Sequence, residues 1–395
     1  MCAGRQGAGG QIMTAKLDAM LDAATRADVP GVVAMAATAE GVIYQGASGL
    51  RDIATGAPMT PDSVFWLASM TKAVTSVAAM QLVEQGRLAL DAPIADVLPM
   101  LGTPQVLDGF DAGGMPMLRP ARAVVTLRRL LTHTSGYGYE TWNAELVRAH
   151  RAMGLPSRAR DWAELAREPL LFDPGSDWNY SISTDVVGKA VEAVSGMPLA
   201  AYFTAHIFGP LRMHETGFAL TAAMRDRSVA LHARQADGSV VATGSDPTAG
   251  RDFLNGGGGL RGTAPDYVRF LRMFLNGGTL DGVRVLEPET VASMGQNHIG
   301  ELVGRPLRSG MAQLSRDADF FPGMEQKWGL GFLINTRTAP SGRSAGGLAW
   351  AGLANTYFWI DPARGVAGVL LGQMLPFADT AMLELLWAFE RGVTA

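Results

Sequence analysis

The sequence predicts a fold of the α/β (α+β) type, in which both ends of the chain build one mainly antiparallel sheet flanked by the terminal helices. Strand-like apolar runs lie at residues 31–48 and 329–372, near the two ends. The stretch from residue 91 to about 220 has mostly helical patterns, with loops rich in Gly and Pro. Strands and helices segregated in this way favour an antiparallel sheet lobe and a separate, mainly helical lobe.

Each element is predicted from its local pattern. An amphipathic segment at residues 15–26 predicts the first helix, and a tight turn at residues 39–41 joins the first two strands. A long apolar segment that stops at Gly86 predicts a helix from residue 69 to residue 85. We expect further helices at residues 185–195, 200–207, 263–275 and 380–389, and strands at residues 31–38, 41–48, 329–335, 355–360 and 366–372.

The order of these elements predicts how the chain is divided. Residues 1–14 are Gly-rich and polar, so we expect a flexible leader, with Met13 as an alternative start of translation. We expect residues 15–80 and 230–395 to form the α/β sheet lobe, and residues 81–229 to form the helical lobe. The active site is then expected in the cleft between the two lobes.

Composition and charge exclude several classes of function. The 395-residue chain is 48% hydrophobic, its net charge is −4 and no basic run stands out, so we expect no nucleic-acid partner. A single cysteine and six histidines without ligand spacing predict no disulfide, no metal and no cofactor. The sequence has no run of about 18 apolar residues and no export signal, so we expect a cytoplasmic protein without a membrane partner.

The most informative motif is Ser69-Met70-Thr71-Lys72, at the start of the long apolar helix. Positions i and i+3 share a helix face, so the Ser69 hydroxyl and the Lys72 amine are expected to meet. A serine becomes a good nucleophile when a nearby base takes its proton, and a lysine with a lowered pKa can help. Arginine, which does not deprotonate, outnumbers lysine about seven to one in this chain. The alternative interpretation is a capping serine and a surface lysine.

Two further segments offer the remaining parts of a nucleophilic site. Tyr180 precedes the helix at residues 185–195, and its phenol can act as a base beside a lysine and then return the proton to the leaving group. The turn after Gly352 can present the Leu353 N–H to a developing oxyanion, beside the N–H of Ser69. The alternative for Tyr180 is a packed aromatic residue at a helix start, and the alternative for the segment around Leu353 is a simple turn before a strand.

A second serine motif competes with the first. Residues 342–346 (Gly-Arg-Ser-Ala-Gly) match Gly-x-Ser-x-Gly, the nucleophile turn of α/β-hydrolases. That arrangement needs a histidine after the serine in the chain, whereas the last histidine here, His298, precedes Ser344. We therefore interpret Ser344 as a loop residue.

Together these motifs resemble the serine β-lactamase and penicillin-binding-protein superfamily. The closest resemblance is to its family VIII carboxylesterases, which are similar to class C β-lactamases. It extends from about Leu17 to the C-terminus, and includes residues 130–136 (Leu-Leu-Thr-His-Thr-Ser-Gly) and the Gly-rich run at residues 255–260. The resemblance implies that Ser69 is the acylated nucleophile, that Lys72 and Tyr180 form the base system, and that the N–H groups of Ser69 and Leu353 form the oxyanion hole.

Two departures from the family pattern concern the substrate. Class C β-lactamases usually carry Lys-Thr-Gly where this chain has Trp350-Ala351-Gly352, and Ile182 replaces the Asn of their Tyr-x-Asn. The loss of a charge and an amide makes the cleft more apolar, which favours uncharged esters. Expected substrate-binding or pocket residues are Trp350, Gly352, Ile182, Tyr137, Tyr139, Trp178 and Phe253.

The resemblance implies a serine carboxylesterase that acts on small-molecule esters with short acyl chains, with weak cephalosporin hydrolysis as a side activity. Three alternatives stay open. They are a class C-like β-lactamase or D-alanyl-D-alanine peptidase-type penicillin-binding protein, an acyltransferase that uses the same acyl-enzyme, and a penicillin-binding sensor that is acylated once. The sequence indicates neither the physiological ester nor the oligomeric state.

Overall fold

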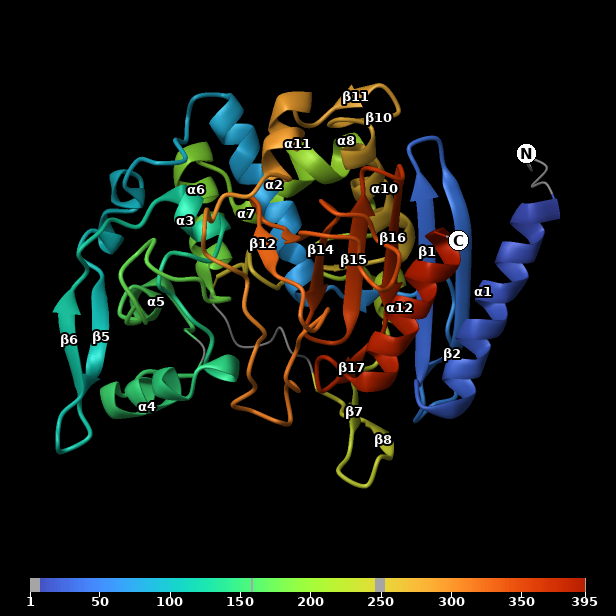
Figure 1. Ribbon diagram of the computed structural model, residues 1–395, viewed down its shortest axis with the longest axis horizontal. Coiled ribbons are helices and arrows are strands. Elements are labelled where there is room, and N and C mark those ends of the chain that lie inside the picture. Colours follow the sequence, from blue (N-terminus) through green and yellow to red (C-terminus); the bar gives the residue numbers. More distant parts are fainter. Residues whose placement is uncertain (1–7, 158, 246–252, 395) are drawn as a thin grey trace.

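The computed structural model describes residues 8–157, 159–245 and 253–394, and it confirms the predicted fold class (Figure 1). Its centre is an eight-stranded sheet in which all neighbouring strands are antiparallel. Both ends of the chain contribute to it, because β1 pairs with β16. In sheet order the strands are β12 (Gln326–Trp328), β13 (Leu333–Asn335), β14 (Leu348–Gly352), β15 (Thr356–Asp361), β16 (Val366–Leu371), β1 (Gly31–Thr38), β2 (Val42–Asp52) and β3 (Ala57–Pro58).

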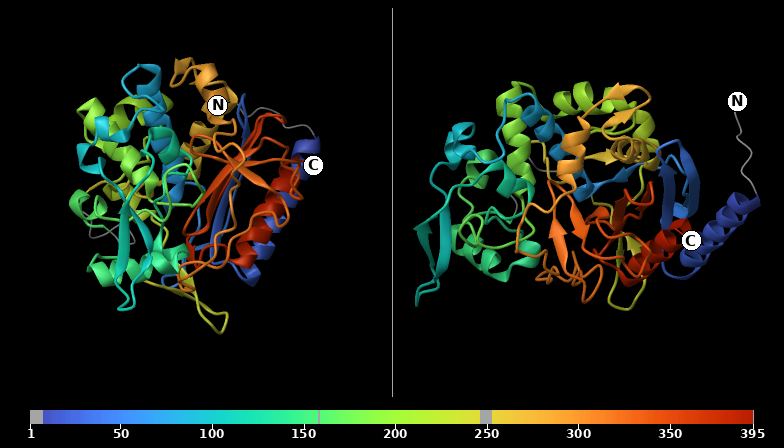
Figure 2. Two further views of the ribbon diagram at one scale, coloured as in Figure 1. Left: turned by 60° about the vertical axis from the view of Figure 1, so that its left-hand side comes forward. Right: turned by 45° about the horizontal axis from the view of Figure 1, so that its top comes forward.

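The two faces of the sheet are covered by different helices. The terminal helices α1 (Ala8–Ala27) and α12 (Thr380–Thr394) pack together on one face, as the left view of Figure 2 shows. The opposite face packs against α10 (Ala264–Leu275) and looks toward the helical lobe. Every residue of β15 and β16 is buried as a result, which explains why both strands are almost continuously apolar in sequence.

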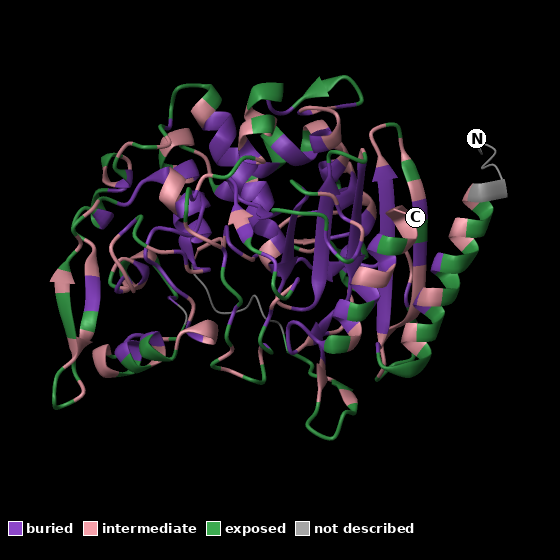
Figure 3. Cartoon of the chain, in the orientation of Figure 1, coloured by how far each residue is buried: buried purple, intermediate pink, exposed green. Residues whose placement is uncertain are grey.

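Helix α2 (Thr71–Glu84) runs through the middle of the molecule. Twelve of its 14 residues are buried (Figure 3), and it packs against α6 (Ser183–Ser195) and α7 (Leu199–Phe203). A helix that is apolar on all sides is stable only when other elements surround it. The turn that precedes α2, Ala68–Met70, packs against β14 and β15, so the start of this helix lies where the sheet meets the helical lobe.

None of the described helices is both long enough and apolar enough to cross a lipid bilayer.

Smaller elements complete the fold. The remaining helices are α3 (Leu127–Leu131), α4 (Ala144–Met153), α5 (Trp162–Leu165), α8 (Gly209–Leu211), α9 (Ala222–Asp226) and α11 (Pro288–Met294). The short strands are β4 (Phe65–Trp66), β5 (Gln105–Phe110), β6 (Pro116–Pro120), β7 (His232–Arg234), β8 (Val240–Ala242), β9 (Arg261–Gly262), β10 (Thr279–Leu280), β11 (Val283–Arg284) and β17 (Met374–Leu375).

The structure differs from the predictions in several segments. Helix α1 begins at Ala8, so residues 8–14, expected in the flexible leader, are helical, and residues 1–7 lie outside the described part of the chain. The helix expected at residues 200–207 is α7 followed by a π-helical turn, Thr204–Phe208. The predicted strand at residues 329–335 is shortened to β13, because a turn with Gly331 at a positive φ of 102° precedes it.

The stretch expected to be mostly helical also contains a hairpin, formed by β5 and β6. Its turn is closed by Asp111, whose Oδ1 accepts hydrogen bonds from the N–H groups of Gly113 (2.9 Å) and Met115 (2.8 Å). Several residues of this hairpin are only half-buried or exposed, so the strands lack the clear alternation that reveals a strand in sequence.

Candidate active site

Ser69 lies in the short 3-10 turn that leads directly into α2. The residue before it, Ala68, has a positive φ of 47°, which residues other than Gly rarely adopt and which is common at functional sites. Thr71 holds the turn, because its Oγ1 donates to the Ala68 carbonyl (2.6 Å) and accepts from the N–H of Leu260 (3.1 Å). The half-buried Ser69 side chain thereby lines a pocket.

Lys72 is buried one turn further along and lies against the serine. Its Nζ donates to Ser69 Oγ (3.2 Å), to the Tyr139 hydroxyl (3.0 Å) and to the carbonyl of Gly257 (2.7 Å). Gly257 is itself fixed, because its N–H donates to Asp185 Oδ1 at the start of α6 (2.8 Å). The three-residue spacing therefore brings the hydroxyl and the amine together, and the Gly-rich run holds the amine in place.

Tyr180 lies on the other side of the serine hydroxyl. Its own hydroxyl is hydrogen-bonded to the Ser69 side chain and accepts from Trp350 Nε1 (3.1 Å), while Lys72 Nζ lies 4.9 Å from the centre of its ring. Burial raises the pKa of the Tyr180 phenol, and Asp185 adds a smaller rise, whereas the hydrogen bonds with Ser69 and Trp350 lower it. The net pKa is above the ordinary value, so the resting phenol is protonated at neutral pH.

An aromatic cluster supports Tyr180 from behind. The rings of Trp350 and His133 lie 4.6 Å and 4.8 Å from the Tyr180 ring, and Trp328 packs on both of them. His133 is buried, and its Nδ1 lies 3.1 Å from Ser181 Oγ. Burial, with a smaller effect of Lys72, holds the pKa of His133 well below its ordinary value, so this ring is neutral. The loop of residues 130–136, which contains His133, therefore positions the Tyr180 phenol without adding charge.

The two tyrosines of the segment Tyr137-Gly138-Tyr139 point in different directions. Tyr139 is half-buried, lines the pocket and contacts the Lys72 amine, whereas Tyr137 is buried in the core. Gly138 packs closely, since a Cβ there would lie 2.7 Å from the Leu171 side chain. The contact between Tyr139 and Lys72 was not expected from the sequence. Gly136 and Gly138 leave the backbone direction open, so the sequence does not show which of the two tyrosines faces the site.

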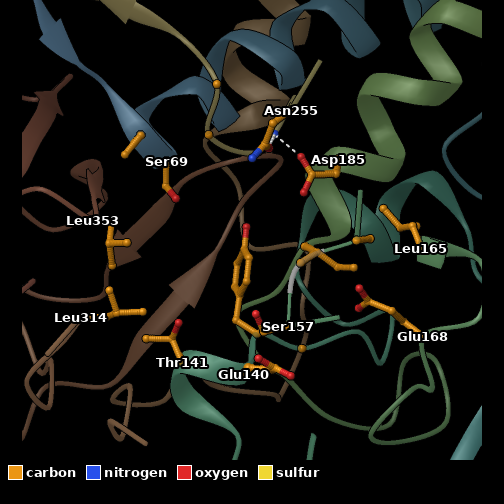
Figure 4. Close-up of a pocket in the computed structure, with 18 of the residues that line it drawn as sticks. Ser69, Glu140, Thr141, Ser157, Leu165, Glu168, Asp185, Asn255, Leu314 and Leu353 are labelled. Atoms are coloured by element: carbon orange, nitrogen blue, oxygen red, sulfur yellow. Dashed lines mark hydrogen bonds between the residues drawn. The ribbon is translucent and has the colours of Figure 1, made fainter. Parts of the chain in front are cut away.

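The predicted oxyanion turn lies beside Ser69. Leu353 follows the end of β14 and lines the pocket near Ser69 (Figure 4). A Cβ on Gly352 would lie 2.4 Å from the carbonyl oxygen of Leu67, so only a glycine allows the strand to approach the nucleophile turn so closely. Buried Asn355, at a positive φ of 59°, fixes the rest of the turn, because its Nδ2 donates to the carbonyls of Met374 and Pro376 (2.8 Å each).

The pocket next to Ser69 has a volume of about 270 Å³. Of the expected pocket residues, Ile182, Phe253 and Tyr139 lie on its wall, together with Leu353. The other expected pocket residues are buried and do not line the pocket. Trp178 and Trp350 belong to the aromatic cluster, Tyr137 to the core and Gly352 to the close contact with the nucleophile turn. The additional apolar wall residues include Leu146, Leu165, Leu254, Met311 and Leu314.

Ser344 lies at the other end of strand β14 from the candidate active site. It lies in the loop before β14, at the end of that strand opposite to Gly352, and its N–H donates to Asp361 Oδ2 (2.8 Å). Across the described residues, no group of three or more His, Cys, Asp or Glu side chains is placed to hold a metal ion.

Comparison with known proteins connects this geometry to a family. Residues 14–387 match the Beta-lactamase family. The chain is 33% identical to Esterase EstB of Burkholderia gladioli, with 91% of this chain and 90% of that protein covered. It is similar to a simvastatin synthase (LovD6 mutant) structure from Aspergillus terreus, with a TM-score of 0.84, 29% identity and coverage of 100% and 98% of the two chains.

A second solved structure is that of EstCE1, described as a hydrolase with promiscuous acyltransferase activity. Its TM-score is 0.77 at 25% identity, with 98% of this chain and 100% of that chain covered. These likenesses extend over nearly the whole chain, as the motifs predicted. The protein belongs to the β-lactamase family, and the predicted likeness to family VIII carboxylesterases of the serine β-lactamase superfamily is confirmed.

Proposed function

We propose that the protein is a serine carboxylesterase that forms an acyl-enzyme on Ser69. One observation carries this proposal: the Ser69 hydroxyl lies within hydrogen-bonding reach of Lys72 and Tyr180, at the wall of a largely apolar pocket. The likeness to EstB, an esterase, and to EstCE1, a hydrolase, supports the same class of reaction.

In the proposed reaction, Ser69 Oγ attacks the ester carbonyl as its proton passes to the Tyr180 and Lys72 pair. Burial makes a resting phenolate at Tyr180 unfavourable, so phenol and amine act as one base system, which accepts the serine proton in the form of the pair that has lost one proton. The oxyanion is held by the N–H groups of Ser69 and Leu353. Collapse of the intermediate breaks the bond to the alcohol oxygen, which takes a proton from Tyr180, and water then releases the acid by the reverse steps.

Two positions near the serine favour uncharged esters. Trp350 supplies an N–H to the Tyr180 oxygen where class C β-lactamases carry a lysine, and apolar Ile182 lines the pocket. A substrate carboxylate thus meets no cation at either position, and its desolvation is not repaid. We propose small esters with short acyl chains as good substrates and cephalosporins as weak ones, which places β-lactamase or peptidase activity below ester hydrolysis.

Acyl transfer is a second candidate, favoured by the overlay with a simvastatin synthase along the full length of the chain. Hydrolysis and transfer share the acyl-enzyme and differ in whether water or another alcohol attacks it. An added alcohol decides between them: under transfer, ester product grows with alcohol concentration while release of p-nitrophenol from the first step stays constant. Under hydrolysis, free acid remains the main product.

The test of the proposed function compares two serines. We expect Ser69→Ala to lower kcat/KM for p-nitrophenyl acetate by about 10⁴-fold or more, since loss of a nucleophile removes the covalent route. The matched control Ser344→Ala should retain wild-type activity. Loss of activity in Ser344→Ala with retention in Ser69→Ala would overturn the assignment. Multiple turnovers of wild type would exclude a sensor that is acylated once.

A further inference from the structure

A buried polar pair lies in the wall of the pocket, away from the reacting serine. Glu140 begins the turn Glu140–Trp142, and His150 lies on α4; both line the pocket although both are almost fully buried. Figure 4 shows Ser69 near the top of the pocket and Glu140 at the bottom. The site chemistry described above uses neither residue.

The hydrogen bond between them fixes the state of the imidazole. His150 Nδ1 lies 2.8 Å from Glu140 Oε1. A carboxylate can only accept, so Nδ1 carries the hydrogen. Burial lowers the pKa of His150, against the opposing effect of Glu140, which favours the neutral ring. In a neutral ring with hydrogen on Nδ1, Nε2 carries a lone pair and is a hydrogen-bond acceptor.

That acceptor has no partner. His150 Nε2 is buried, and no side chain or backbone group in the described ranges forms a hydrogen bond with it. Most buried polar atoms in folded proteins have a partner, and an exception in a residue that lines a pocket calls for a partner from outside the chain, such as a group of a bound ligand or a water molecule. The lining includes apolar Leu146 and Leu165 as well as polar Ser157 and Glu168. The complement of the Nε2 lone pair is a hydrogen-bond donor on the ligand.

We propose that His150, held by Glu140, is a specificity residue that accepts a hydrogen bond from a hydroxyl group on the substrate, remote from the ester. This inference rests on the proposed esterase function and deepens it. The favoured substrates are then esters in which a short apolar chain separates the reacting carbonyl from a hydroxyl group. A site that offers a buried acceptor rejects an analogue with a methyl group in the same place, since the acceptor stays unpaired.

The test compares matched esters in wild type and His150→Phe. One series carries an ω-hydroxyacyl chain of increasing length on p-nitrophenol, and its partner series has a methyl group in place of the hydroxyl. A second pair of series places the hydroxyl on the alcohol part of acetate esters. The readout is the ratio of kcat/KM for the hydroxyl and methyl members, which does not depend on the fraction of folded enzyme.

We expect one series to show a hydroxyl preference at a defined length, and His150→Phe to lower that ratio about tenfold, as the loss of a buried hydrogen bond predicts. Glu140→Gln, which keeps the shape of the pair but weakens the control of the tautomer, should lower it roughly threefold. The control His206→Phe changes an exposed histidine and should retain the wild-type ratio.

Two results would overturn the proposal: a ratio that does not peak at any length in wild type, or a ratio unchanged in both His150→Phe and Glu140→Gln. Failure of the esterase function itself looks different, because p-nitrophenyl acetate would then give no Ser69-dependent release of p-nitrophenol. In that case calorimetry with the matching diols and alkanols measures the same hydroxyl preference as binding, and a preference that His150→Phe leaves intact counts against the proposal.

Discussion

The two sides of the active-site pocket are built in different ways. On the sheet side, Ser69 and Leu353 are positioned by backbone: a strained residue before the serine, a glycine at the end of β14 and a buried asparagine in the turn. On the helical-lobe side, Tyr139, Tyr180 and His150 act through side chains whose partners are other side chains. We infer that the sheet side sets where the substrate carbonyl lies, and that the lobe side sets proton transfer and selectivity.

The largest difference in activity is expected between variants of the two tyrosines on the lobe side, Tyr180 and Tyr139. Tyr180 is hydrogen-bonded to the nucleophile, whereas Tyr139 bonds to Lys72 and packs beside the Tyr180 ring, with the ring centres 5.3 Å apart. We expect Tyr180→Phe to lower kcat by about 10²–10⁴-fold, the range for loss of a general acid–base group, and Tyr139→Phe by only about tenfold. Steady-state kinetics with p-nitrophenyl acetate checks both. The reverse order would make Tyr139 the main proton carrier.

The sheet side is tested by Gly352→Ala. The added methyl group would meet the Leu67 carbonyl at 2.4 Å and Thr356 Oγ1 at 2.2 Å, so the strand must move away from the nucleophile turn. We expect kcat to fall about 10²-fold or more, as when an oxyanion-hole donor is lost. Thermal unfolding should show a stability loss of about 1–3 kcal/mol from overpacking. Full activity in a stable variant would show that this contact does not position Leu353.

The link between the two sides is the hydrogen bond from Trp350 on β14 to Tyr180. Donation to the phenol oxygen lowers the pKa of Tyr180, so Trp350→Phe should raise that pKa further. We expect kcat/KM to rise with pH as the Tyr180 and Lys72 pair loses a proton, and in Trp350→Phe this rise should move to higher pH, with about tenfold less activity at neutral pH. A pH–rate profile of both enzymes measures this. An unmoved profile would mean that Tyr180 does not set the rising limb.

The smallest effect concerns the substrate class. Ile182→Asn restores the amide that the family's β-lactamases carry, but leaves Trp350 in place of their lysine. We expect the ratio of nitrocefin to p-nitrophenyl acetate hydrolysis to rise by a few-fold, roughly the value of one hydrogen bond. Spectrophotometric assays of both substrates give the ratio. A rise of several orders of magnitude would show that the cleft is already suited to β-lactams.

The sheet side was also the more predictable one from sequence. The contact of Ser69 with Lys72 follows from helix periodicity, and the strands at residues 355–360 and 366–372 follow from short apolar runs bounded by turn residues. The lobe side depends on long-range packing. The orientations of Tyr137 and Tyr139, and the meeting of Glu140 with His150 across a turn, are set by contacts that no local pattern encodes.

The central claim is that Ser69 carries the acyl group. Rapid quenching of the enzyme with an excess of p-nitrophenyl ester, followed by proteolysis and mass spectrometry, measures where the acyl group is attached. The account predicts one acylated peptide, with the adduct on Ser69 and none in Ser69→Ala. An adduct on Ser344, or turnover in Ser69→Ala at the wild-type rate, would contradict it.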